Sequence, residues 1–213
     1  MAEVSRVEES VRLSATALEE WSGHVECVLR GIAHALNNRA AALSAVIELS
    51  QDPADEPATT RAILATELAR VQGLTAVVRS LGAPRSGAEA FGPGDAALEA
   101  LAVLEMHSEH RNRTVSIDAG SAPPVRMPRW MYVRALIVMG ATVSRTTGDI
   151  KITVAGDGDW VVARVEGAGA PSAGLTPYVT ELARAMGGEP LAERYGFRVP
   201  TLVALRQREG RSA

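Results

Sequence analysis

The sequence has little cysteine, no long apolar run and no excess of basic residues, and each shortage excludes a class of protein. The single cysteine, Cys27, allows no disulfide within the chain and fits a reducing compartment. No stretch approaches the roughly 18 uninterrupted apolar residues of a membrane span, and the first ten residues are too polar for a signal peptide. We therefore expect a cytoplasmic protein without a membrane span. The net charge of −3 is not the basic field of a nucleic-acid-binding protein, so we expect no nucleic acid partner.

The composition is that of an ordinary globular chain with one or two domains. Of the 213 residues, 46% are hydrophobic and 22% are charged, which provides enough apolar material for a core. Residues 1–90 hold 8 arginines and 12 acidic residues, whereas residues 91–213 hold 14 basic and 13 acidic residues. This shift in charge balance, together with a change from a helical hydrophobic period to mixed helix and strand periods, predicts two units. They are residues 1–86 and residues 87–213.

The first unit carries the pattern of two amphipathic helices. A helical seam is predicted from apolar residues in one register, namely Val11, Leu18, Val25, Leu29, Ala33, Leu36, Ala40, Leu43 and Ile47. Pro53 and Pro57 end this helix, and a second helix has its apolar face at Leu64, Leu68, Val71, Leu74, Val78 and Leu81. A lone antiparallel hairpin cannot bury both of its faces. We therefore predict a homodimer in which two chains form a four-helix bundle.

The second unit alternates between helical and strand patterns. Helices are predicted at 96–111, 128–145 and 174–188, and strands at 114–119 and near 123–127. A hairpin is predicted at 148–167, a last hairpin at 189–207 and a frayed tail at 208–213. This order predicts the α+β class: after the helical hairpin comes an α/β sandwich, with one sheet covered on one face by helices.

One short stretch of the first helix is chemically unusual. His34, Asn37 and Asn38 interrupt a run of alanine and leucine although they are poorer helix formers. Asn38 lies one turn after His34 on the same face. His34 is next to the seam residue Ala33, so its ring should project from the flank of the bundle. A neutral imidazole there is a competent nucleophile at cytosolic pH.

The segment HALNN on a hairpin helix, followed by a second helix and an α/β unit, resembles the core of bacterial two-component histidine kinases. In that family a dimeric phosphotransfer bundle precedes a Bergerat-like ATPase domain, and the resemblance covers roughly residues 20–206. It implies that His34 is the phosphoacceptor and that Asn38 assists it. The family places an acid directly after the histidine to activate it for attack on ATP. Here that position is Ala35.

The ATPase-like part departs further from the family pattern. The family holds Mg²⁺ and phosphates with asparagines at positions that align with Val138 and Thr142. Neither side chain replaces an amide as a magnesium ligand with the same geometry. The first glycine box keeps Gly167 and Gly169, but where the family reads adenine with an aspartate it offers Glu166, or Val165 under the other alignment.

The second glycine box and phosphate lid of the family are reduced to residues 170–175. The unit is therefore interpreted as a degenerate ATPase-like domain. We expect no cofactor, metal or ATP to be bound by this chain, and by the family pattern we expect Mg²⁺ on the receiver partner.

Three functions from different classes stay open. The favoured prediction is a histidine phosphotransferase that relays a phosphoryl group between His34 and receiver-domain aspartates of response regulators, without ATP-dependent autophosphorylation. An upstream kinase is a further candidate partner. The first alternative is a divergent ATP-dependent sensor histidine kinase. The second is a non-catalytic dimeric pseudokinase scaffold in which His34 is inert. Whether the chain is an enzyme depends on which of these holds.

Two other groups of residues invite a functional interpretation. Cys27 is interpreted as a small interface or surface residue rather than a redox sensor. His107 and His110 have a spacing that could serve a metal, but no further ligands are visible in the sequence. We predict instead that both histidines lie at a solvated helix end, where they interact well with the helix dipole.

Overall fold

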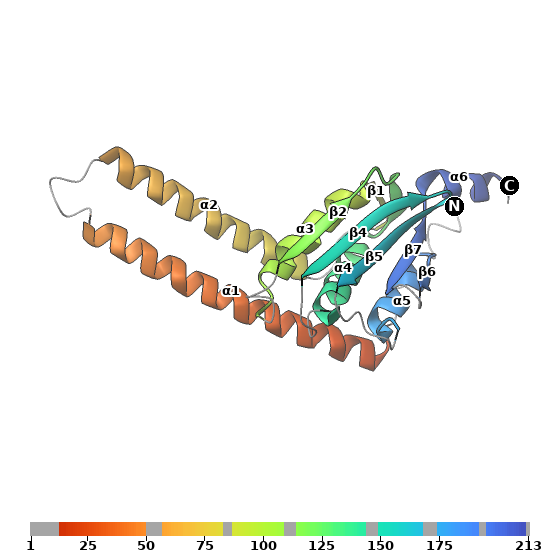
Figure 1. Ribbon diagram of the computed structural model, residues 1–213, viewed down its shortest axis with the longest axis horizontal. Coiled ribbons are helices and arrows are strands. Elements are labelled where there is room, and N and C mark those ends of the chain that lie inside the picture. The colour runs from red at the N-terminus through yellow and green to blue at the C-terminus, as the bar shows by residue number, and fades with distance from the viewer. Residues whose placement is uncertain are drawn as a thin grey trace.

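The computed structural model describes residues 13–49, 57–82, 87–108, 114–143, 149–167, 174–191 and 195–211, and it begins with a long helical hairpin. Helix α1 is Ala15–Leu49 and helix α2 is Pro57–Leu81. Figure 1 shows the far half of the hairpin projecting from the rest of the molecule, while the first half of α1 runs along an α/β unit. Pro57 suits the first position of α2 because no helical partner is needed there for its missing N–H.

The α/β unit is built on a five-stranded sheet with the order β2-β4-β5-β7-β6. These strands are Val115–Ala119, Ile150–Asp157, Trp160–Gly167, Gly196–Pro200 and Glu189–Leu191, in that order across the sheet. β2 pairs in parallel with β4, and the other neighbours are antiparallel. A separate antiparallel pair consists of β1 (Glu89–Phe91) and β3 (Val125–Met127).

Helices α3 (Pro93–Glu105), α4 (Arg129–Val143) and α5 (Pro177–Ala185) pack on one face of this sheet. Strand β4 shows why, because Ile150, Ile152 and Val154 are buried while Lys151 between them is exposed. Such alternation is typical of a sheet with one covered face. The prediction of an α+β chain with a sandwich after the hairpin is confirmed.

The end of the chain differs from the prediction. The strands β6 and β7 form the expected hairpin, but residues after Pro200 form helix α6 (Leu202–Arg211) rather than a strand and a frayed tail. The Thr201 hydroxyl accepts a hydrogen bond from the Ala204 backbone N–H at 3.1 Å. This contact caps the helix start, and Ala204 is buried.

Hairpin and sandwich share one continuous core. Val28 and Ile32 of α1, and Leu74 and Val77 of α2, belong to the same buried cluster as the sandwich residues. That cluster includes Tyr132, which is fully buried. The first half of α1 therefore packs on two neighbours, α2 and the sandwich. The boundary near residue 87 stays a prediction.

The predicted seam of α1 is not the face that packs within the chain. Leu29, Leu36 and Ile47 are 47%, 42% and 58% exposed, whereas Val28 and Ile32 are buried. The helix thus carries two apolar stripes, one turned inward and one turned to solvent. The hydrophobic periodicity located the second stripe and missed the first.

Candidate functional site

His34 and Asn38 both lie on α1 with exposed side chains. They are one helical turn apart, so they share a face of the helix. Asn37 is also exposed. The imidazole is open to a macromolecular partner, as its position beside the predicted seam suggested.

Ala35, where the resembling kinases carry an acid, faces the interior instead. It is half-buried and packs against the hydrophobic core. Its methyl group can neither accept nor donate a proton, so it cannot activate the neighbouring imidazole.

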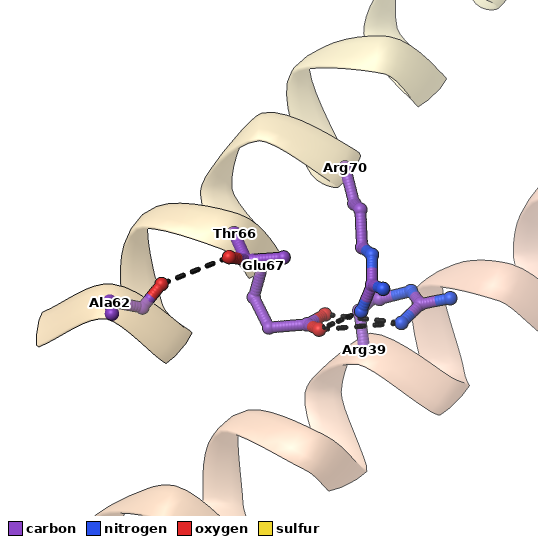
Figure 2. A network of polar contacts seen from close by, with 5 residues as sticks. All are labelled: Arg39, Ala62, Thr66, Glu67 and Arg70. Atoms are coloured by element: carbon purple, nitrogen blue, oxygen red, sulfur yellow. Dashed lines mark hydrogen bonds and ion pairs between the residues drawn. The ribbon is translucent and has the colours of Figure 1, made fainter. Parts of the chain in front are cut away.

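An ion cluster around the buried carboxylate of Glu67 holds the two hairpin helices together close to this stretch (Figure 2). The Glu67 side chain of α2 is only 6% exposed and accepts hydrogen bonds from Arg39 of α1 at 3.3 and 3.4 Å. Arg70, one turn further along α2, forms a second ion pair with it. Because a carboxylate inside a helix pair must be paired, the cluster fixes the register of the hairpin one residue after Asn38.

The sequence pattern gave no role to Glu67, although a signal is present. It is an acidic residue beside apolar positions 64, 68 and 71, with an arginine three residues later. An unpaired charge within the apolar face of a helix is costly to bury. Such a residue therefore predicts an oppositely charged partner on the facing helix.

The remnant nucleotide positions are only partly brought together. Val138 on α4 is fully buried, and the Thr142 hydroxyl donates to the Val138 carbonyl at 2.8 Å. Glu166 on β5 pairs across from exposed Lys151 and is itself exposed, which places it on the face of the sheet opposite the helices. The sheet therefore separates Glu166 from Thr142.

Of the two remnant glycines, Gly167 ends β5 opposite Ile150, and Gly169 lies outside the described residues. The neighbouring Lys151 side chain forms an ion pair with Asp118 at 2.9 Å. That carboxylate raises the pKa of Lys151.

A cleft of about 570 Å³ runs between α1 and the ends of α4 and α5. Of the described residues, the sandwich lines it with the hydroxyl residues Thr142 and Thr176, and α1 lines it with Thr16, Glu19, Glu20, Gly23, His24, Glu26, Cys27 and Arg30. Arg30 is paired with Glu26 at 2.9 Å. Acidic side chains therefore outnumber basic ones among the described residues of the wall. Cys27 is half-buried within it, in agreement with a small interface residue.

The first turns of α1 are fastened to α5 by polar contacts. The backbone N–H and hydroxyl of Ser14 donate to the Glu181 carboxylate at 2.8 and 2.6 Å. These hydrogen bonds lower the pKa of Glu181. The Glu20 carboxylate accepts the backbone N–H of Tyr178 at 3.2 Å, a donor that the first turn of α5 leaves free.

An aromatic contact continues this attachment. The rings of Trp21 and Tyr178 are stacked, with centroids 5.6 Å apart and planes 7° apart. Tyr178 is fully buried, and its burial raises the pKa of its hydroxyl to about 12. The phenol therefore stays protonated throughout the physiological range.

The prediction that His107 lies at a solvated helix end is wrong. His107 follows α3 but is only 1% exposed, because it packs against His24 of α1. His110 lies outside the described residues. Within the described parts of the chain, no group of three or more histidine, cysteine or acidic residues is placed to hold a metal ion.

No model of a known protein family matches the sequence, and no curated protein matches it. Among solved structures, the chain is similar to the histidine kinase AdeS of Acinetobacter baumannii, with 14% identity and a TM-score of 0.44 over 79% of this chain and 98% of that chain. It is similar to a histidine kinase from Burkholderia phymatum, with 11% identity and a TM-score of 0.42 over 89% and 98% of the two chains.

A third structure, histidine kinase ThkA in complex with response regulator protein TrrA, has 17% identity and a TM-score of 0.42 over 94% of this chain and 67% of that chain. These neighbours are histidine kinases, the class that the HALNN stretch resembles. No helix among the described residues is long and apolar enough to cross a membrane.

Proposed function

We propose that this chain is a dimeric histidine phosphotransferase of a two-component relay. In the proposed step, an imidazole nitrogen of His34 attacks the phosphorus of a receiver aspartyl phosphate. The P–N bond forms as the P–O bond breaks, the aspartate leaves as a carboxylate, and the imidazole releases its N–H proton to solvent. Transfer to a second receiver is the reverse step. Mg²⁺ belongs to the receiver, and the chain's task is to position the imidazole.

The observation that carries the proposal is the exposed pair of His34 and Asn38 on a helix that is anchored on both sides. The Glu67 cluster holds α1 against α2, and Val28 and Ile32 hold it in the common core. A nucleophile fixed on a rigid helix loses little freedom when a partner docks. Asn38 is placed to hydrogen-bond either the ring or the incoming phosphoryl group.

Three features favour a relay that takes no phosphate from ATP. Ala35 offers no acid beside the histidine, and Val138 directs its side chain into the core. Among the described residues, the cleft that contains Thr142 is lined by three glutamates and one arginine. Such a wall repels a polyphosphate rather than attracting it.

The test is transfer from receiver domains phosphorylated beforehand with labelled acetyl phosphate and then freed of it. We expect the wild type to gain an acid-labile, base-stable label, because phosphohistidine has that stability, and His34→Ala to gain none. Asn38→Ala should slow labelling by about 10-fold, as expected for the loss of one positioning hydrogen bond. Asn37→Ala, the matched neighbour, should label at the wild-type rate.

Two results would contradict the relay. Label appearing on His34 from γ-labelled ATP, without any receiver, would identify an active kinase. Equal labelling of wild type and His34→Ala would show that the histidine is inert and would favour the scaffold function. A circular dichroism spectrum of each variant serves as the control for folding.

The partner proposed for the exposed stripe of the hairpin is a second copy of the chain. Large apolar side chains are 41–60% exposed along both helices at Leu29, Leu36, Ile47, Ile63, Leu64, Leu68 and Val78. They recur at helical spacing over the whole hairpin. A second hairpin with the same stripe is the self-complementary partner that such a surface fits.

Replacing Leu36 and Leu68 together by glutamate should convert the dimer into a monomer, because it places charges in the middle of the shared interface. Sedimentation equilibrium measures the change, and we expect at least a 100-fold weaker association. Leu98 on α3 is equally exposed, at 58%, but lies outside the hairpin. Leu98→Glu should therefore leave the dimer intact, and a monomeric wild type would refute this part of the proposal.

A further inference from the structure

The inner face of the projecting half of the hairpin contains a charge where an apolar core would be expected. Beyond Ile32 on α1 and before Leu74 on α2, Glu67 is the only buried residue among those that the structure describes. Its carboxylate is paired with Arg39 of α1 and Arg70 of α2 (Figure 2). In this half of the hairpin, the contact between the two helices is therefore centred on an ion cluster.

Arg39 and Glu67 continue the stripes that pack within the chain. Arg39 follows Ile32 by seven residues, which is about two turns, so both lie on nearly the same face of α1. Glu67 precedes Leu74 on α2 by the same interval. Ile32 and Leu74 belong to the common core. The inner stripes of both helices thus change from apolar to ionic as the hairpin leaves the sandwich.

The ion cluster constrains direction more strictly than an apolar contact does. The Arg39 guanidinium donates to both carboxylate oxygens of Glu67, at 3.3 and 3.4 Å, and Arg70 pairs with the same carboxylate from within α2. A rotation of α1 by a fraction of a turn would separate Arg39 from Glu67 and leave the buried carboxylate with fewer partners. Fixing the register of packed helices is the best-attested use of such buried polar groups.

The rotation of α1 decides where the imidazole of His34 points. His34 precedes Arg39 by five residues, or about 140° around the helix, so the exposed ring projects on a different side from the guanidinium. The ring lies roughly 5–6 Å from the helix axis, so a rotation of about 10° moves it by roughly 1 Å. A misplacement of about 1 Å can slow a positioned reaction about 100-fold.

We propose that Glu67 is a positioning residue for phosphoryl transfer at His34. Through its ion pairs with Arg39 and Arg70, it sets the rotation of α1 and therefore the direction from which the imidazole meets a docked receiver. This inference rests on the proposed relay and adds to it a residue of α2 that acts through α1. Loss of the cluster should slow transfer inside the complex without weakening the docking of the receiver.

The test is single-turnover transfer to His34 from a receiver domain that has been phosphorylated with labelled acetyl phosphate and freed of it, over a range of receiver concentrations. Arg39→Met with Glu67→Met replaces the ion pair between the helices with apolar side chains, an exchange that often retains stability. Arg70, whose side chain is 52% exposed, keeps its charge in water. We expect the rate constant at saturation to fall roughly 10- to 100-fold. The half-saturating receiver concentration should stay within about 2-fold of the wild-type value.

Two controls separate positioning from folding and from reactivity. Glu26→Met with Arg30→Met makes the same exchange at an exposed ion pair within α1 and should transfer at the wild-type rate. Phosphoramidate, a small phosphoryl donor that needs no docking, should label His34 equally fast in the wild type and in both double variants. The urea midpoint of the Arg39 and Glu67 double variant should be no lower than that of the wild type.

An Arg39 and Glu67 double variant that transfers with the wild-type rate constant would overturn the role of Glu67. A loss that appears only as a higher half-saturating concentration would do the same, because it places the cluster in docking. So would a loss matched by a lower urea midpoint or by slower labelling with phosphoramidate. A wild type that is labelled by phosphoramidate but by none of the receivers would refute the relay itself, and this result is obtained before any variant is made.

Discussion

Replacing Gly31 with alanine should detach α1 from the sandwich and lower the free energy of unfolding by about 3 kcal/mol. A Cβ at this position would lie 1.6 Å from the Met106 carbonyl oxygen and 2.8 Å from the carbonyl carbon. Both atoms are backbone, so no side chain can rotate away and the helix itself must move. Replacing a glycine inside a helix with alanine stabilises the helix by about 1 kcal/mol. The substitution lowers the free energy of unfolding only because the cost of the clash exceeds this gain.

The same helix offers a control in Gly23, where an added Cβ would meet nothing within 4 Å. Gly23→Ala should therefore raise the free energy of unfolding by about 1 kcal/mol. Urea titrations at one fixed protein concentration measure both variants, because the stability of the proposed dimer would depend on concentration. Two stabilised variants would mean that α1 does not lie against Met106 in solution.

Much of the fold could be predicted because the hydrophobic pattern of most segments favours the same helix or strand that tertiary packing requires. Strand β4 alternates Ile150, Ile152 and Val154 with polar residues, and the turn between β4 and β5 has Gly158 in the left-handed region, at φ 59°. The last helix was missed because Thr201 and Val203 are β-branched residues typical of strands. A threonine directly before a helix also caps it, and the Thr201 hydroxyl does so here.

The placement of the candidate site residues could be predicted only where it depends on a single helix. The spacing of His34 and Asn38 fixes their common face, and their exposure follows from their position beside the seam. The attachment of α1 to the sandwich brings together residues more than 80 positions apart, such as His24 and His107. No periodicity within one helix carries that information, since partners so distant in sequence are set by tertiary packing.

The contact between the hairpin and α4 could not be predicted from the sequence for the same reason. Arg134 is 8% exposed, and it lies within α4 among apolar residues, where the sequence alone marks it as an unexplained charge. In the structure, its guanidinium lies over the rings of Trp21 and Trp130, 4.5 and 5.0 Å from their centroids. It also donates to the Leu81 and Gly82 carbonyls at 3.1 and 2.6 Å.

Arg134→Ala should lower the free energy of unfolding by roughly 3 kcal/mol, since it removes two cation–π contacts of a buried guanidinium and two charge-assisted hydrogen bonds. The carbonyls at the end of α2 would lose their donor, at the segment that connects the hairpin to the sandwich. Arg134→Lys should recover only part of the loss, because an ammonium group cannot stack on two indole rings and donate to two carbonyls with a planar fork.

The control for this substitution is Arg126 on β3, an exposed arginine whose replacement by alanine should change the free energy of unfolding by no more than about 0.5 kcal/mol. Urea unfolding followed by tryptophan fluorescence is the suitable measurement, because Trp21 and Trp130 both report directly on the guanidinium. If Arg134 joins the two parts, Arg134→Ala should also reduce hydrogen-exchange protection at both Trp21 and Leu81. An Arg134→Ala protein as stable as Arg126→Ala would mean that hairpin and sandwich are held together by the apolar core alone.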